Sequence, residues 1–211
     1  MVFSNRAEAG RILASKLGNY KDRTDTIILA LPRGGIPVAF EVGKALGVPV
    51  DVFVVRKLGV PGQEELAMGA IATGDIRIIN YEVVNQLSIG QNTIDAVAER
   101  ERHELRRREE LYRGDRKPHE LRGKTIILVD DGIATGSTMR AAIAALRQLG
   151  PARIVVAVPV AAAETCRQIA SEVDELVCAA TPEGFHAISQ WYIRFEQTTD
   201  DEVRDLLNRA A

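Results

Sequence analysis

The sequence has few cysteines and no long apolar run, and both absences exclude classes of protein. Only two cysteines, Cys166 and Cys178, occur among 211 residues, and neither belongs to a CxxC pair. A disulfide framework or a zinc site is therefore not expected. The longest apolar stretch, residues 154–163, is far too short to cross a bilayer, and the first residues show no signal-peptide core. We expect a cytoplasmic protein with no membrane partner.

An excess of charge of one sign is also missing. Lys and Arg number 27 against 29 Asp and Glu, which gives a formal charge of −2, and hydrophobic residues make up 46%. Because this balance creates no strong field, nothing in it demands a nucleic acid as partner, and none is expected. The length suits one sizeable domain, or one domain with a small appendage.

Short β-branched runs alternate with segments in which apolar residues recur every three or four positions. The runs predict strands at residues 26–31, 50–55, 76–79, 125–129, 154–160 and 176–179. The other segments predict helices at residues 7–17, 37–46, 92–112, 139–149 and 164–171. Strand–helix alternation with short connections indicates an α/β fold, a doubly wound and mainly parallel sheet flanked by helices.

Three segments fit the alternation less well. Residues 58–74 are rich in glycine and small side chains, which predicts a loop or loose hairpin. Residues 92–112 mix Glu and Arg closely, as a solvated helix face does, although this helix could equally be the contact of a homodimer. We expect a single domain over residues 1–211, with a charged helical insertion at about 82–120 and a terminal segment at about 181–211.

The stretch IILVDDGIATGST, residues 126–138, places two acids and a hydroxyl-rich turn at the end of a buried strand. Ligands bind open α/β sheets at such strand ends. The turn at residues 135–138 lies at an expected helix N-terminus, where free N–H groups favour a phosphate. Asp130 and Asp131 would repel phosphate but suit vicinal hydroxyls, or a hydrated Mg²⁺ held through water. A ribose 5-phosphate satisfies both halves, whereas capping chemistry at a strand end is the alternative.

This stretch resembles the binding motif of the type I phosphoribosyltransferases, which use 5-phosphoribosyl 1-diphosphate (PRPP). Four apolar residues, two acids and a small-residue turn match the family pattern, and Gly132 is a departure because a branched residue is commoner there. Other phosphate motifs, GxxxxGK[ST] and GxGxxG, are absent. The resemblance covers most of the chain from Arg6 to the last expected strand. It implies PRPP binding by Asp130, Asp131, Gly132, Ala134, Thr135, Gly136, Ser137 and Thr138.

A second loop, residues 31–37, resembles the pyrophosphate loop of the same family. Gly34 and Gly35 permit backbone geometry closed to other residues, so their N–H groups can face an anion, and Arg33 can add a charged contact. An ordinary Pro/Gly turn is the alternative for this loop taken alone. The family often has a cis peptide here, which a sequence cannot reveal.

Arg56 and Lys57 end the second expected strand, on the same edge of the sheet. They are candidates for pyrophosphate contacts, because Lys57 resembles a basic residue with that role in the family. A solvated Lys–Arg pair is the alternative. The segment that follows, residues 58–74, resembles the mobile loop that closes over PRPP.

Acceptor specificity in the family lies in a hood built from terminal segments, and residues 181–195 are its candidate here. Phe185, Trp191 and Tyr192 could stack on a ring, and His186 could act as an acid or base. The alternative is that these aromatic residues form the core of a small appendage.

Taken together, the resemblance implies an enzyme of nucleotide metabolism. It would bind Mg²⁺–PRPP, join C1 of ribose to a nitrogen nucleophile of a small-molecule acceptor, and release pyrophosphate. Its catalytic residues would be Arg33, Lys57, Asp130 and Asp131. A regulator that binds PRPP or a nucleotide without turnover is the alternative, because a fold does not fix function.

Overall fold

A parallel sheet of five strands forms the central layer of the computed structural model, which describes residues 1–210. Its strands are β1 (Thr26–Ala30), β2 (Val50–Val52), β6 (Thr125–Val129), β7 (Arg153–Val160) and β8 (Glu175–Ala180), in the spatial order β2-β1-β6-β7-β8. Every neighbouring pair is parallel. β1 and β6 are buried at every position, as apolar strands covered on both faces must be. The predicted doubly wound α/β fold is confirmed.

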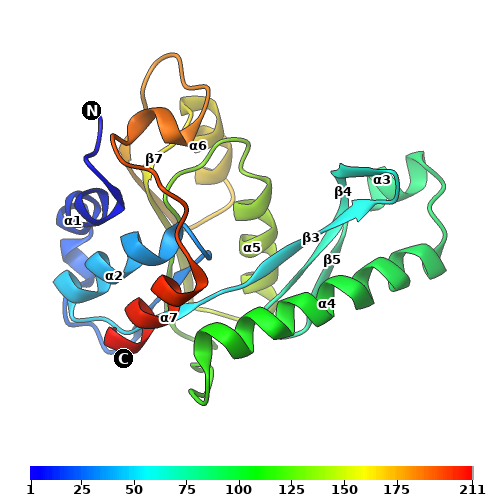
Figure 1. Cartoon of the computed structure of the whole chain (residues 1–211), viewed down its shortest axis with the longest axis horizontal. Coiled ribbons are helices and arrows are strands. Elements are labelled where there is room, and N and C mark those ends of the chain that lie inside the picture. Colours follow the sequence, from blue (N-terminus) through cyan, green and yellow to red (C-terminus); the bar gives the residue numbers. More distant parts are fainter. Residues whose placement is uncertain (211) are drawn as a thin grey trace.

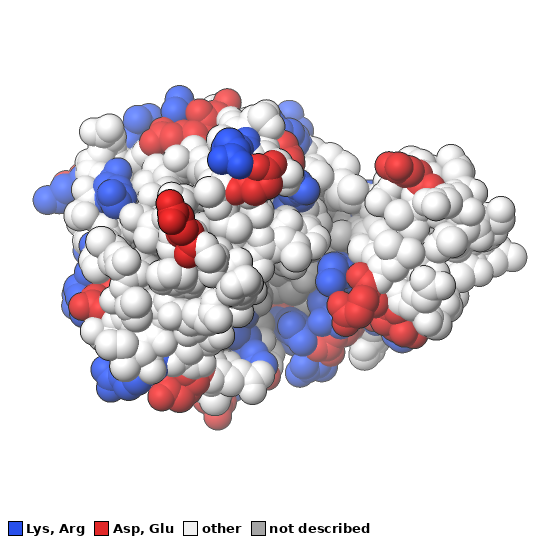
Figure 2. Space-filling model, turned by 90° about the horizontal axis from the view of Figure 1, so that it is seen from above, with Lys and Arg blue, Asp and Glu red and all other residues white. Residues whose placement is uncertain are grey.

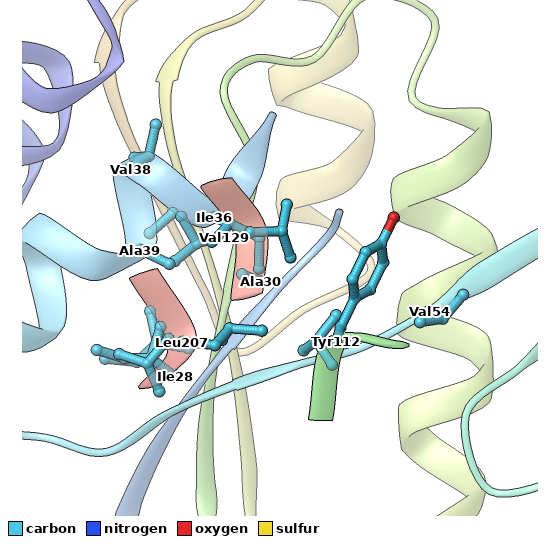
Figure 3. Close-up of a cluster of buried hydrophobic side chains, with 14 of the residues drawn as sticks. Ile28, Ala30, Ile36, Val38, Ala39, Val54, Tyr112, Val129 and Leu207 are labelled. Atoms are coloured by element: carbon cyan, nitrogen blue, oxygen red, sulfur yellow. The ribbon is translucent and has the colours of Figure 1, made fainter. Parts of the chain in front are cut away.

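Helices cover both faces of this sheet (Figure 1). They are α1 (Arg6–Lys16), α2 (Gly35–Leu46), α5 (Ser137–Gln148), α6 (Ala163–Ala170) and α7 (Asp200–Arg209). Successive strand side chains point to opposite faces, so Ile28 joins the core under α1, α2 and α7. Figure 3 shows part of this core, including Ile28, Val129 and Leu207. Ile27 joins the second core, under α5 and α6.

Residues 58–74, predicted as a loop or loose hairpin, form a long hairpin within an antiparallel sheet, and its pairing is irregular at Leu58–Val60. β3 (Val55–Val60), β4 (Gln63–Ala72) and β5 (Ile76–Ile79) pair in the order β3-β4-β5. A Cβ on Gly69 would collide with the carbonyl oxygen of Ile78 on the neighbouring strand. The small residues that suggested a loop therefore permit a close approach between strands.

This second sheet and two helices form an arm that extends from the main body (Figure 1), and Figure 2 shows the narrow waist between the two parts. The helices are α3 (Tyr81–Gln86), which was not predicted, and α4 (Gln91–Arg113), which was. The expected strand at 50–55 was too long, because β2 ends at Val52. Arg56 and Lys57 consequently belong to β3 in the arm rather than to the end of a parallel strand.

The N-terminal residues meet the segment that follows β8, beside β7 and β8. The N–H of Phe3 donates to the carbonyl of Trp191 at 2.8 Å, and the N–H of Ile193 donates to the carbonyl of Phe3 at 2.8 Å. A 3₁₀ turn, Ile188–Trp191, directs this segment back over the sheet edge. Within residues 1–210, no helix has the length and apolar character needed to span a membrane.

Candidate functional site

The two predicted acids lie at the carboxyl edge of the parallel sheet, directly after β6. Asp131 as a whole residue is 8% exposed, and its backbone N–H donates to Oδ1 of Asp130 at 2.8 Å. The next turn is pinned to the neighbouring strand, because the N–H of Ile133 donates to the carbonyl of Val160 at 2.9 Å. The acid pair is therefore held between two central strands.

The electrostatics of the pair follow from this burial. Desolvation raises the pKa of Asp130 well above its ordinary value, and the negative charge of Asp131 raises it further. Desolvation also raises the pKa of Asp131, but the guanidinium of Arg6 opposes that shift. Asp130 is therefore the harder of the two to ionise.

Arg6 is a site residue that sequence reasoning missed. Its Nε donates to Oδ2 of Asp131 at 2.8 Å, and its Nη1 donates to the carbonyl of Glu196 at 2.7 Å. Its guanidinium carbon lies 3.9 Å from the centroid of the Phe195 ring. Arg6 is the first residue of α1, where the helix dipole disfavours a cation. An arginine at this unfavourable position could have indicated that its charge is paired with an acid in another part of the chain. The hydroxyl of Tyr192 adds a bond of 2.6 Å to the carbonyl of Asp131.

A hollow of about 180 Å³ adjoins Asp130 at the N-terminus of α5. It is lined by Asp130, Gly132, Ile133, Ala134, Thr135, Gly136, Ser137, Thr138, Met139 and Ile188. Gly136 caps α5 with φ of 79° and has no side chain to offer, so the first N–H groups of the helix are available to an anion. The hydroxyls of Thr135 and Ser137 lie 2.8 Å apart beside them. The predicted phosphate turn thus forms one concave surface.

Gly132, the departure from the family pattern, has a packing reason. A Cβ there would lie 2.8 Å from Cγ2 of Ile188 and 3.0 Å from the carbonyl oxygen of Val160. Ile188 comes from the terminal segment and takes the space that a branched residue would otherwise fill. One wall of the hollow is therefore supplied by that segment.

The predicted pyrophosphate loop lies directly against the acid pair. The N–H of Leu31 donates to the carbonyl of Val129 at 2.9 Å, and a Cβ on Gly34 would collide with the carboxylate of Asp131. The peptide between Pro32 and Arg33 is cis. Two motifs about a hundred residues apart in sequence are thus neighbours at one sheet edge.

Arg33, Arg56 and Lys57, the three cations predicted to contact pyrophosphate, lie in three different surroundings. Arg33 is half-buried at the loop, with Nη1 3.7 Å from Oδ1 of Asp200. Arg56 is bound to Glu101 of α4, to whose Oε2 it donates at 3.0 and 2.6 Å. Lys57 is exposed on β3. Of the three, Arg33 is the one that belongs to the glycine loop itself.

The terminal aromatic residues form a core of their own. Phe185 and Trp191 pack on a buried cluster that includes Phe3 and Tyr192, whereas His186 is exposed. The indole N–H of Trp191 is buried and has no hydrogen-bond partner within residues 1–210.

A larger hollow of about 700 Å³ lies at the C-terminal end of α2, lined in part by Phe40, Lys44 and Arg209. It faces the start of β2, at the opposite edge of the sheet from the acid pair. Since ligands of open α/β sheets bind at the carboxyl edge, we place the site at the smaller hollow.

A doubly wound sheet with an acid pair, an anion turn and a glycine loop at one edge defines a protein of the type I phosphoribosyltransferase fold. The sequence profile of the phosphoribosyl transferase domain matches residues 3–188. The chain belongs to this family.

Similar proteins agree with that membership. A protein of Mycobacterium tuberculosis with the provisional name of a phosphoribosyl transferase is 46% identical over 209 residues, which are 99% of this chain and 47% of the relative. The chain thus spans about half the length of that relative. The bifunctional protein PyrR of Chloroflexus aurantiacus is 35% identical over 147 residues, covering 67% of this chain and 72% of that protein.

Solved structures extend the comparison to the fold. The protein TT1426 from Thermus thermophilus is 38% identical, covers 100% of both chains and superposes with a TM-score of 0.88. A hypoxanthine-guanine phosphoribosyltransferase from Bacillus anthracis is 11% identical with a TM-score of 0.50, covering 87% of this chain and 83% of its own. At that identity, the likeness concerns the fold alone.

Proposed function

We propose that this protein is an enzyme that transfers the 5-phosphoribosyl group from Mg²⁺–PRPP to a nitrogen nucleophile, a nucleobase or related acceptor, with release of pyrophosphate. One observation carries the proposal: the acid pair lies between an anion hollow on one side and a glycine loop on the other. PRPP has its groups in the same order, with a 5-phosphate, ribose hydroxyls and a diphosphate.

The carboxylates retain acceptor capacity for the ribose hydroxyls. Asp131 has Oδ2 engaged by Arg6, which leaves Oδ1, and Asp130 has Oδ1 engaged by a backbone N–H, which leaves Oδ2. An ionised carboxylate only accepts hydrogen bonds, so both acids suit hydroxyl donors. Asp130 and Asp131 would thereby orient C1 of the ribose, and orientation of reacting groups lowers a barrier.

The donors at this edge fit Mg²⁺ brought in by the ligand. Two carboxylates supply hard oxygen atoms, and no cluster of three or more metal-ligating side chains occurs within residues 1–210. Asp130 and Asp131 would hold the ion through water, while PRPP oxygens supply most of its coordination. When bound, Mg²⁺ would neutralise charge on the diphosphate.

The remaining residues act on the leaving group and on water. The N–H group of Gly34 and the guanidinium of Arg33 would contact pyrophosphate as the C1–O bond breaks, and such contacts strengthen as charge develops. Gly35 would support the loop, because its N–H already donates to the carbonyl of Leu31 at 3.0 Å. Lys57 on the arm would add a cation, and closure of the arm would exclude water. Arg56 keeps its bond to Glu101 and would act only through β3.

The acceptor would bind against the terminal segment. Trp191 would shape this surface by packing, because its indole N–H is buried in the cluster with Phe3 and Tyr192 and is not exposed to a ligand. Phe185 would support Trp191 by packing, and His186 would be free to exchange a proton with the acceptor.

Two measurements test the proposal. Calorimetry with Mg²⁺–PRPP should show binding, and a ligand at ~100 times its Kd should raise the unfolding free energy by ~2.7 kcal/mol. Pyrophosphate release from PRPP should then be measured against a panel of nucleobases. Absence of both heat and a melting shift contradicts the proposal, whereas binding without turnover would favour the regulator.

A further inference from the structure

Asp200, the first residue of α7, contacts side chains from two distant parts of the chain. Its Oδ1 accepts a hydrogen bond from the hydroxyl of Tyr112 at 2.6 Å and lies 3.7 Å from Nη1 of Arg33. Tyr112 belongs to α4, is 2% exposed and is one of the core side chains drawn in Figure 3. The C-terminal helix thus brings a carboxylate to the cation that the glycine loop offers to pyrophosphate.

The two contacts of Asp200 differ in strength. Burial, together with the bond to Asp200, raises the pKa of Tyr112 to about 12, so this hydroxyl stays a donor at neutral pH. The contact with Arg33 exceeds hydrogen-bond distance, and the side chains of Arg33 and Asp200 are 34% and 39% exposed. Asp200 is therefore anchored to α4, whereas Arg33 can leave it at little cost.

We propose that Asp200 is a positioning residue that competes with pyrophosphate for the guanidinium of Arg33. The inference rests on the proposed function, in which Arg33 contacts the leaving group. Without ligand, the carboxylate supplies a counter-charge and holds Arg33 at the mouth of the loop. When pyrophosphate is present, Arg33 exchanges Asp200 for a phosphate oxygen, while Tyr112 keeps Asp200 in place.

An anchored carboxylate beside the leaving group also favours its departure. Pyrophosphate held by a guanidinium, a backbone N–H group and Mg²⁺ would bind tightly, and slow product release limits turnover in many enzymes. A fixed negative charge close to the product weakens its binding by repulsion. The ribose 5-phosphate end of the ligand, at the hollow beside α5, should not be affected.

The test is the affinity for Mg²⁺–pyrophosphate, measured by calorimetry on the full chain. Asp200→Asn keeps an oxygen for the Tyr112 hydroxyl and removes the charge. We expect its affinity for Mg²⁺–pyrophosphate to rise about twofold to fivefold, the range of a partly exposed ion pair. Its affinity for ribose 5-phosphate should stay at the wild-type value.

Asp201→Asn is the matched control, because it makes the same change of charge in the same helical turn. The side chain of Asp201 is 88% exposed and pairs with Arg204, so this variant should bind pyrophosphate as the wild type does. Unchanged or weaker pyrophosphate binding by Asp200→Asn overturns the inference, and so does an equal gain in Asp201→Asn. If Asp200→Asn melts well below the wild type, Asp200→Ser provides the same comparison with a smaller neutral side chain, while Thr199 still caps the helix. Wild-type protein that binds neither PRPP nor pyrophosphate overturns the proposed function itself.

Discussion

Arg6 and Asp131 form an ion pair at 2.8 Å that joins the first helix to the acid pair at the end of β6. The two side chains are 12% and 11% exposed, so both charges are almost fully removed from water. The same guanidinium lies over Phe195 and donates to the carbonyl of Glu196. Arg6 belongs to α1, and its guanidinium contacts both the central motif and the C-terminal segment. The N-terminal residues therefore belong to the site.

Removing Arg6 should therefore cost far more than removing a surface arginine. Arg6→Gln leaves the carboxylate of Asp131 buried and unpaired, and we expect a loss of about 3–5 kcal/mol in unfolding free energy. The double variant Arg6→Gln/Asp131→Asn should recover much of that loss, since neither charge remains. Denaturant unfolding of the wild type, both single variants and the double variant measures the coupling. Additive effects would show that the ion pair is not what holds the segments together.

Asp130 should make PRPP affinity depend on pH. Its pKa is raised well above the ordinary value, so Asp130 of the unliganded protein keeps its proton to a higher pH than an ordinary aspartate does. Ribose hydroxyls and a hydrated cation favour the ionised form, so binding should release protons and tighten as the pH rises through the raised pKa. Calorimetry in two buffers of different ionisation enthalpy measures the protons released. Proton uptake, or a pH dependence that survives in Asp130→Asn, would contradict the assignment.

The same shift has a consequence for stability. A carboxyl group whose pKa is higher in the folded protein adds stability below its unfolded pKa, and this contribution is lost as the pH rises through the folded value. Asp130→Asn should therefore raise the melting temperature of the unliganded protein at neutral pH, and the gain should shrink on acidification. Melting curves of both proteins at several pH values test the sign.

The parts of the structure that could be predicted are those that local sequence determines. The strand at residues 125–129 is apolar at every position, so its burial and the anion turn after it follow from one short stretch. In the arm, α4 and β5 were predicted, but the length of β4 was not. Gly69 disfavours a strand by its intrinsic propensity, and only the close approach of Ile78 on the neighbouring strand requires a glycine there. The bond from Arg6 to Asp131 spans 125 residues, and no local pattern encodes such a pair. Helix α7 was not predicted, because its apolar positions are few. Its stability comes from packing on α2 and α4, which the local sequence does not show.

Gly132 and Ile188 should behave as a coupled pair. Gly132→Val places a branched side chain where Ile188 already packs, and overpacking typically costs ~1–3 kcal/mol. Ile188→Ala vacates that space, so the double variant should recover stability and ribose 5-phosphate affinity relative to Gly132→Val alone. Melting temperature and calorimetry on the three variants test this. If Ile188→Ala does not relieve Gly132→Val, the contact with the carbonyl of Val160 is the limiting one.

Arg33→Ala should slow turnover while leaving the affinity for ribose 5-phosphate nearly unchanged. Arg33 belongs to the glycine loop, whereas the 5-phosphate is assigned to the hollow beside α5, so the two contacts lie at opposite ends of the ligand. Pyrophosphate gains negative charge as the C1–O bond breaks, and a donor to it is worth most in the transition state. Loss of such a donor typically reduces the rate by ~10²–10³-fold.

The control for Arg33→Ala is Arg153→Ala. Arg153 opens β7 at the opposite edge of the sheet and pairs with Glu175, with its side chain 46% exposed, so its loss should leave turnover unchanged. Melting temperature, ribose 5-phosphate affinity and pyrophosphate release should be measured on the same preparation of each variant. A structural arginine would lower the melting temperature and weaken every ligand together. If ribose 5-phosphate affinity and melting temperature both fall in Arg33→Ala, the residue supports the loop and does not act on the leaving group.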